Sequence, residues 1–171
     1  MLLANGGADL PAVLPGTSGA SAFEEALRVL TAHLSREIVR DGEGATTVVR
    51  LDVVGARDAL QAELVARAVC NSPLVKTAIH GRDPNWGRIL CAAGYAGVDF
   101  DPAKTDVWLQ GVRVCRKGLA AEYDEAALSK KLDLPNCAIR LQLGEKGPGA
   151  ATFWTCDLTH DYITINASYR T

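Results

Sequence analysis

The chain has 171 residues, of which 48% are apolar and 22% are charged, and its net charge is −2 with both signs intermixed. This balance is that of a soluble globular domain, and it excludes the strongly basic face that nucleic-acid binding needs. No apolar run approaches the roughly 20 residues that cross a bilayer, and the first residues show no signal-peptide or transit-peptide pattern. The length predicts one domain over residues 1–171, or two small units that divide near residues 100–105 and share a core.

The first half of the chain carries helix and strand signals in turn. Ser21 and Glu24 form a capping box before an apolar stripe at helical spacing, which predicts a helix to about Arg40. Glycines end it, and β-branched residues then predict a strand over residues 46–54. The remaining elements expected in this half are a helix over 58–70, a short strand over 74–79, a turn over 81–85 and a helix over 86–93.

The second half mixes strands with shorter helices. Gln110 and Gly111 separate two short arms, over 106–109 and 112–115, and predict a hairpin. The other expected elements are a helix over 123–132, strands over 137–143 and 152–156, and a short helix in the tail at 159–169. Helices combined with antiparallel strands favour an α+β or layered α/β fold.

Cysteine and histidine positions give no framework for a metal site. The five cysteines are widely spaced with no CxxC pair, and most lie among apolar neighbours, which favours reduced, buried thiols in a reducing compartment. The three histidines, His33, His80 and His160, are scattered, so no metal is expected.

A glycine-flanked acidic turn is the first candidate for chemistry. Asp41 and Glu43 lie among glycines where the predicted helix meets the predicted strand. Glycine lets the backbone approach a ligand closely, so a carboxylate here could hold a substrate ammonium group. An acidic turn that faces water is the alternative, because such turns are common.

Two further segments have both a functional and a structural interpretation. Lys76 lies in an apolar stretch, where it could pair with a carboxylate, line a cleft, or protect an edge strand from aggregation. Residues 81–88 concentrate two arginines near a helix start, which suits anion binding. An Arg82–Asp83 or Arg88–Asp83 clasp with Trp86 in the core explains the same residues structurally.

The C-terminal residues are too apolar to form a free tail. Ile163, Ile165 and Tyr169 predict that this segment docks on the rest of the protein. Once docked, Asn166 offers a donor and an acceptor, and Thr171 offers a hydroxyl and a carboxylate. Such a set suits a substrate that carries an ammonium and a carboxylate.

Four segments, supported by residues 2–6, resemble the ornithine acetyltransferase (glutamate N-acetyltransferase) family in order and spacing. They are residues 41–46, 72–78, 81–88 and 156–167. The resemblance covers essentially the whole chain. It implies the family's layered α/β/β/α fold, like that of N-terminal-nucleophile enzymes, of which this chain holds an incomplete part, the C-terminal portion of the β chain.

The resemblance also implies an activity. Members of this family cleave themselves before a threonine, which then carries acetyl from N2-acetylornithine to glutamate in arginine biosynthesis. An oxyanion hole on the α chain stabilises the intermediate, and α and β chains form an α2β2 heterotetramer. No cofactor is expected, although some members accept acetyl-CoA as a co-substrate, and neither nucleic acid nor membrane is expected as a partner.

By position, the resemblance marks Glu43, Asn166 and Thr171 as substrate-binding and assigns no catalytic role to Lys76 or Arg88. No catalytic residue is expected in this chain, because the nucleophilic threonine belongs upstream; Thr17, Thr31 and Thr46 do not match its context. The isolated chain is therefore expected to be inactive. The alternative is a non-catalytic fragment that binds amino acids or assembles with a partner.

Residues 92–98 look most like plant and algal members of the family. Those members work in plastids. The expected location is therefore the chloroplast stroma if the source is a plant or an alga, and the cytoplasm otherwise.

Overall fold

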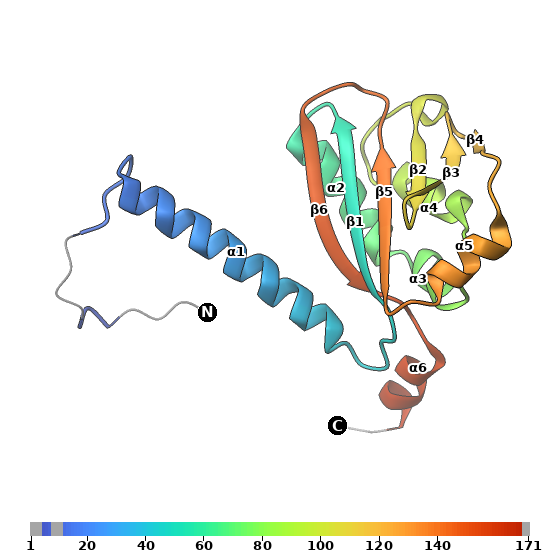
Figure 1. The fold of residues 1–171 in the computed structure, drawn as a ribbon, viewed down its shortest axis with the longest axis horizontal. Coiled ribbons are helices and arrows are strands. Elements are labelled where there is room, and N and C mark those ends of the chain that lie inside the picture. Colours follow the sequence, from blue (N-terminus) through green and yellow to red (C-terminus); the bar gives the residue numbers. More distant parts are fainter. Residues whose placement is uncertain (1–4, 8–11, 169–171) are drawn as a thin grey trace. The chain divides into compact units, whose positions relative to one another are not determined.

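A computed structural model of the chain describes residues 5–7 and 12–168. The chain divides into two units, residues 1–35 and 36–171. Helix α1 (Ser18–Arg40) makes up most of the first unit and ends in the second. The second unit holds one six-stranded sheet with helices packed on it (Figure 1), which confirms the predicted α+β class. None of the helices in the described ranges is both long and apolar enough to cross a bilayer.

The sheet has the strand order β4-β3-β2-β5-β1-β6. The central strand β1 pairs in parallel with β5 and antiparallel with β6, which forms one edge. The strands are β1 (Val48–Ala56), β2 (Asp106–Leu109), β3 (Val112–Arg116), β4 (Leu119–Ala120), β5 (Asn136–Gln142) and β6 (Gly149–Cys156). The other helices are α2 (Ala59–Asn71), α3 (Pro73–His80), α4 (Trp86–Gly94), η1 (Pro102–Lys104), α5 (Glu125–Leu132) and α6 (His160–Ala167).

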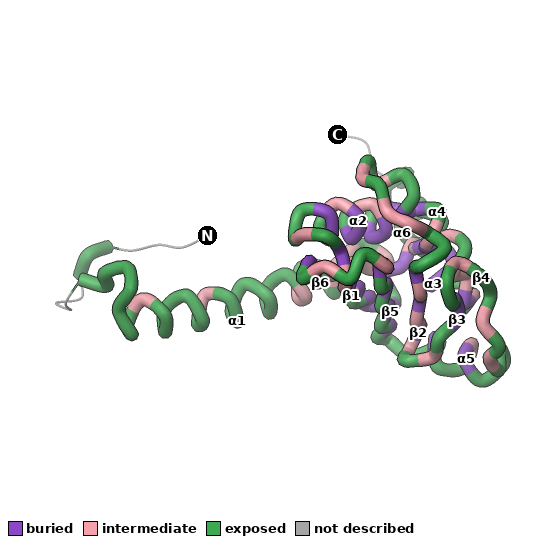
Figure 2. The backbone as a smooth tube through the Cα atoms, turned by 90° about the horizontal axis from the view of Figure 1, so that it is seen from above, coloured by how far each residue is buried: buried purple, intermediate pink, exposed green. Residues whose placement is uncertain are grey.

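The core lies between one face of this sheet and helices α2 and α4. Side chains alternate along a strand, so every second residue of β1 and β5 points to the same face. Leu51 and Val53 on β1 and Leu141 on β5 are fully buried, and so are Ala62, Val65 and Ala66 of α2. In Figure 2 the buried residues gather along these elements.

The opposite face of the sheet is polar and carries two tryptophans beside arginines. Trp154 lies 5.8 Å from the guanidinium of Arg36 and 6.0 Å from that of Arg50, measured to the ring centre. Trp108 lies 5.2 Å from that of Arg140 on the neighbouring strand. A guanidinium over an aromatic ring is a favourable arrangement.

Most predicted elements are confirmed, with shifts of a few residues at their ends. The predicted strand over residues 74–79 is wrong, because this segment is helix α3. Ser72 caps it by accepting a hydrogen bond from Val75 N, and Pro73 occupies its first turn. Val75, Ala78 and Ile79 are buried at helical spacing. The predicted hairpin is confirmed, with Gln110 and Gly111 both at positive φ.

The difference in burial between Leu51 on β1 and Leu119 on β4 predicts a large difference between their truncations. Leu51→Ala should lower the free energy of unfolding by about 2–5 kcal/mol, because it leaves a cavity in the core. Leu119→Ala should change it by less than about 0.5 kcal/mol, because that side chain is 73% exposed. Urea unfolding followed by circular dichroism measures both, and equal losses would contradict this assignment of the core.

Candidate functional site

The candidate site begins at the turn that follows α1. Gly42 N donates to Val39 O at 3.2 Å, and Ala45 N donates to Gly42 O at 3.0 Å. Gly44 adopts a φ of +67°, and a Cβ there would lie 2.7 Å from Tyr162 N. Only glycine satisfies both demands, so the turn lies directly against the first turn of α6.

This close approach brings Glu43 and Asn166 together across 123 residues of sequence. The Asn166 amide Nδ2 donates to Glu43 Oε2 at 2.7 Å and to the Tyr162 carbonyl at 2.9 Å. Both residues are exposed. Glu43 Oε1 and Asn166 Oδ1 have no hydrogen-bond donor among the residues that the structure describes. The pair therefore presents a carboxylate oxygen and an amide oxygen that can both accept from an ammonium group.

Asp157 anchors the turn from behind. Its carboxylate is buried and accepts from the backbone N–H groups of Thr46 at 2.8 Å and Thr47 at 2.9 Å. Its second oxygen accepts from the Thr46 hydroxyl at 2.5 Å. A buried carboxylate is costly unless such donors surround it, and here they fix the start of β1 relative to the end of β6.

His80 and Thr159, which lie close to Asp157, connect this region to α3 and α6. His80, the last residue of α3, places Nδ1 3.2 Å from Asp157 Oδ2, and an Nδ1–H tautomer donates there. Thr159 is the N-cap of α6 and accepts from Tyr162 N at 3.3 Å. Its hydroxyl also donates to the Gly44 carbonyl at 2.7 Å. Helix α6 is thus capped by the same residue that holds the Glu43 turn.

The structure separates the predicted site residues into three groups. Glu43 and Asn166 meet, whereas Thr171 lies outside the described residues. Lys76 lies half-buried on helix α3, so its interpretation as an edge-strand residue is wrong. Its backbone carbonyl accepts from Leu158 N at 3.3 Å, close to the anchor.

The two arginines of residues 81–88 have structural contacts. Arg88 Nη1 donates to the Leu74 carbonyl at 3.0 Å and to the Thr77 hydroxyl at 3.3 Å, which ties α4 to α3. Arg82 pairs with Asp133, at the end of α5. The expected pairs with Asp83 do not form in the part of the chain that the structure describes. These contacts favour the structural interpretation of this segment.

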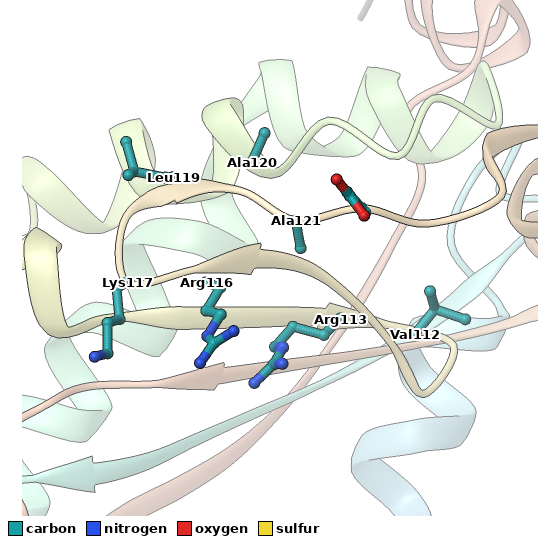
Figure 3. A pocket seen from close by; sticks show the side chains of 8 residues that line it. Val112, Arg113, Arg116, Lys117, Leu119, Ala120 and Ala121 are labelled. Atoms are coloured by element: carbon teal, nitrogen blue, oxygen red, sulfur yellow. The ribbon is translucent and has the colours of Figure 1, made fainter.

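A separate hollow of about 630 Å³ lies at the β3–β4 edge of the sheet, the edge opposite β6 (Figure 3). A bulge where β3 pairs with β2 buries both Val114 and Cys115, so that Arg113 and Arg116 lie outside the core. Lys117 adds a third cation. Sequence reasoning missed this basic hollow. The bulge that leaves the two arginines outside the core arises from the pairing of β2 with β3, and no local sequence pattern predicts it.

All five cysteines are free. Burial raises the pKa of the Cys70 and Cys137 thiols from 9.0 to about 12 in each case. Cys91, by contrast, is exposed. The predicted burial is confirmed for Cys70, Cys115 and Cys137 and is wrong for Cys91, so the thiols differ widely in their access to solvent.

Comparison with known proteins relates the whole chain to a family. A family model described as the ArgJ family matches residues 1–171. The chain is 46% identical over 171 residues to "Arginine biosynthesis bifunctional protein ArgJ" from Symbiobacterium thermophilum, covering 100% of this chain and 42% of the relative. A mitochondrial ArgJ protein from Yarrowia lipolytica is 42% identical over 175 residues, covering 99% of this chain and 41% of the relative. The chain thus spans about two fifths of the length of these relatives.

A solved structure gives the same result. The crystal structure of the argJ protein from Bacillus halodurans superposes with a TM-score of 0.89 and 34% sequence identity. The match covers 94% of this chain and 76% of the solved chain. The fold described above is therefore shared with that protein.

The anchor makes a prediction about stability. Asp157→Asn replaces the carboxylate, one oxygen of which accepts two backbone N–H bonds, with an uncharged carboxamide. We expect the free energy of unfolding to fall by about 1–3 kcal/mol. Asp161→Asn, an exposed change on α6, is the matched control and should have little effect. Equal losses in urea unfolding would show that Asp157 is not an anchor.

The thiols make a second prediction. Because the thiolate is the reactive form, Cys91 should react with a disulfide reagent at pH 8, while Cys70 and Cys137 stay unreactive until urea unfolds the chain. The stability that these two protonated thiols contribute is fully present below about pH 9 and is lost as pH rises toward 12. Mass spectrometry of the labelled cysteines measures this order, and labelling of Cys70 before Cys91 in the folded protein would refute it.

Proposed function

Because the chain belongs to the ArgJ family, we propose that it is one portion of an enzyme of arginine biosynthesis and supplies part of its amino-acid-binding site. The observation that carries this proposal is the contact between Glu43 and Asn166. A carboxylate next to an amide at the protein surface is suited to a substrate that carries an ammonium group.

The proposed reaction is acetyl transfer from N2-acetylornithine to glutamate through an acetyl-threonine intermediate. The threonine hydroxyl forms an ester with the acetyl group, and ornithine leaves with its amine protonated. The amine of glutamate then attacks the ester, takes the acetyl group, and releases the hydroxyl. The threonine and the oxyanion hole belong to parts of the enzyme outside this chain, so we expect no catalytic residue here. The exchange needs no cofactor, and acetyl-CoA could serve as an alternative acetyl donor.

Within this scheme each described residue has a defined task. Glu43 holds the substrate ammonium group through its free carboxylate oxygen. Asn166 fixes the Glu43 carboxylate with its N–H and offers its own carbonyl oxygen to the same ammonium group. Asp157 and Thr159 hold the turn and α6 against each other, and they position this pair without touching the substrate. Thr171 remains a predicted contact of the substrate.

We also propose self-cleavage of a longer precursor and assembly of the two products into an α2β2 heterotetramer. The length of the solved chain supports the cleavage. This chain covers 76% of the solved Bacillus halodurans chain but only 42% of the Symbiobacterium thermophilum relative, so the solved chain is much shorter than that relative. The chloroplast location stays a prediction, and the bacterial and yeast mitochondrial relatives give it no support.

The ammonium contact predicts the behaviour of a single substitution. Glu43→Gln keeps the shape of the side chain and removes its charge, so kcat/KM for N2-acetylornithine should fall about 10- to 150-fold, as expected for a lost charge-assisted hydrogen bond. The assay uses this chain co-expressed with the remaining part of the Symbiobacterium thermophilum relative. Asp41→Asn, in the same turn, is the control and should leave kcat/KM nearly unchanged.

The same assay separates the alternative functions. An unchanged kcat/KM in Glu43→Gln would remove Glu43 from the substrate site. Amino-acid binding without any acetyl exchange in the complete assembly would favour a non-catalytic binding fragment. The isolated chain should show no exchange, since it lacks a matching nucleophile.

A further inference from the structure

The hairpin formed by β3 and β4 gathers three cations at one edge of the sheet. In a regular strand Arg113 and Arg116 would point to opposite faces, because successive side chains alternate. The bulge in β3 adds one residue between them and turns both to the same side. Figure 3 shows the side chains of Arg113, Arg116 and Lys117 directed to that side.

The backbone that carries these cations is fixed by its neighbours. Lys117 N donates to Asp106 Oδ1 on β2 at 2.6 Å, and the second oxygen of Asp106 lies 3.8 Å from Arg113 Nη1. Lys117 and Gly118 both adopt positive φ in the two-residue turn of the hairpin. A Cβ on Gly118 would lie 2.6 Å from the Pro102 carbonyl oxygen, so this turn packs directly on η1. A ligand that binds the hairpin therefore meets a preorganised backbone.

The charge of the cluster is poorly balanced by the protein itself. Neither Arg116 nor Lys117 forms an ion pair with any residue in the ranges 5–7 and 12–168, and the contact of Arg113 with Asp106 is too long for a hydrogen bond. All three cations are exposed, although the chain as a whole carries a net charge of −2. Neighbouring like charges repel each other, so an anion that bridges them is bound favourably.

The charge and size of the basic hollow limit the class of anion. A single phosphate ester carries at most about two negative charges at pH 7, whereas a diphosphate ester carries about three, which matches the three cations. Each guanidinium fork can bind two oxygens of one phosphate group, and the lysine adds a point charge. The volume of about 630 Å³ exceeds what a diphosphate alone fills and lies in the range of small-molecule sites.

The remaining lining residues describe the uncharged part of the ligand. Val112 and Ala121 offer apolar surface beside the cations, and Glu122 adds a carboxylate. A carboxylate repels a wholly anionic ligand and favours one that also carries hydroxyl or amino donors. We propose that the basic hollow binds a nucleoside diphosphate, with its phosphates on the three cations, its base on the apolar residues and its sugar hydroxyls donating to Glu122.

This inference does not rest on the proposed function. The basic hollow lies at the edge of the sheet opposite β6, and neither Glu43 nor Asn166 lines it. Binding there can therefore be measured without any acetyl transfer.

The test is isothermal titration calorimetry of the full chain with adenosine diphosphate (ADP) at low ionic strength, where screening of exposed charges is weakest. We expect saturable binding of one ADP per chain. Inorganic pyrophosphate, which tests the diphosphate group alone, should bind at least about 10-fold more weakly because it leaves the apolar residues uncovered. Adenosine, which lacks the phosphates, should show no measurable binding.

Two double variants with the same change in net charge test the location of the site. Arg116→Gln with Lys117→Asn should raise the Kd for ADP by about 10-fold or more per lost cation, and asparagine tolerates the positive φ at position 117. The matched control, Lys130→Gln with Lys131→Gln, changes exposed residues of α5 outside the hollow and should bind like the unmodified chain. Arg116→Lys keeps the charge but loses the fork, so its Kd should lie in between.

Each outcome decides the inference. Unchanged unfolding midpoints by circular dichroism would show that weaker binding by the Arg116 and Lys117 variant reflects lost contacts. No saturable binding of ADP would overturn the proposal, and so would equal weakening by both double variants, since the attraction would then be diffuse. Adenosine that binds as tightly as ADP would overturn the role of the cations, and pyrophosphate that binds as tightly would overturn the assignment to a nucleotide.

Discussion

The buried carboxylate of Asp157 is the interaction on which the candidate site depends. It lies just after β6 and holds the backbone at the start of β1, which is the neighbouring strand of the sheet. Because a desolvated carboxylate must keep its donors, the two chain segments cannot move apart without exposing it or leaving it unpaired. The start of β1 and the end of the edge strand β6 are therefore fixed to each other by one side chain.

The geometry of the surface pair follows from this anchor. With the start of β1 fixed, the turn before it can approach α6 only as closely as Gly44 allows. Thr159 then fixes that approach by capping α6 and holding the Gly44 carbonyl. Asn166 lies at the other end of α6, two turns along, where its amide reaches Glu43. The exposed polar pair is thus positioned by buried groups that the substrate does not contact.

Local patterns predicted most of the fold, and the exceptions have physical causes. Apolar periodicity predicted α1 and α2, and the Gln110-Gly111 turn predicted the hairpin. Helix α3 was misassigned because its β-branched residues suggested a strand, while the short cap signal from Ser72 and Pro73 carried the correct information. Glu43 and Asn166 were each identified by family resemblance, but their contact spans 123 residues and no local pattern encodes it. Asp157 went unrecognised as an anchor for the same reason.

The position of β6 at the edge of the sheet has a consequence for the behaviour of the chain in solution. This strand has eight residues, Gly149–Cys156, and none of them is charged or proline. Edge strands usually carry such residues because unpaired backbone N–H and C=O groups recruit further strands. The other edge, β4, is only two residues long and offers little template for such pairing. Non-native strand addition in concentrated samples should therefore begin at β6, and a lysine introduced on this strand would be the natural means to suppress it.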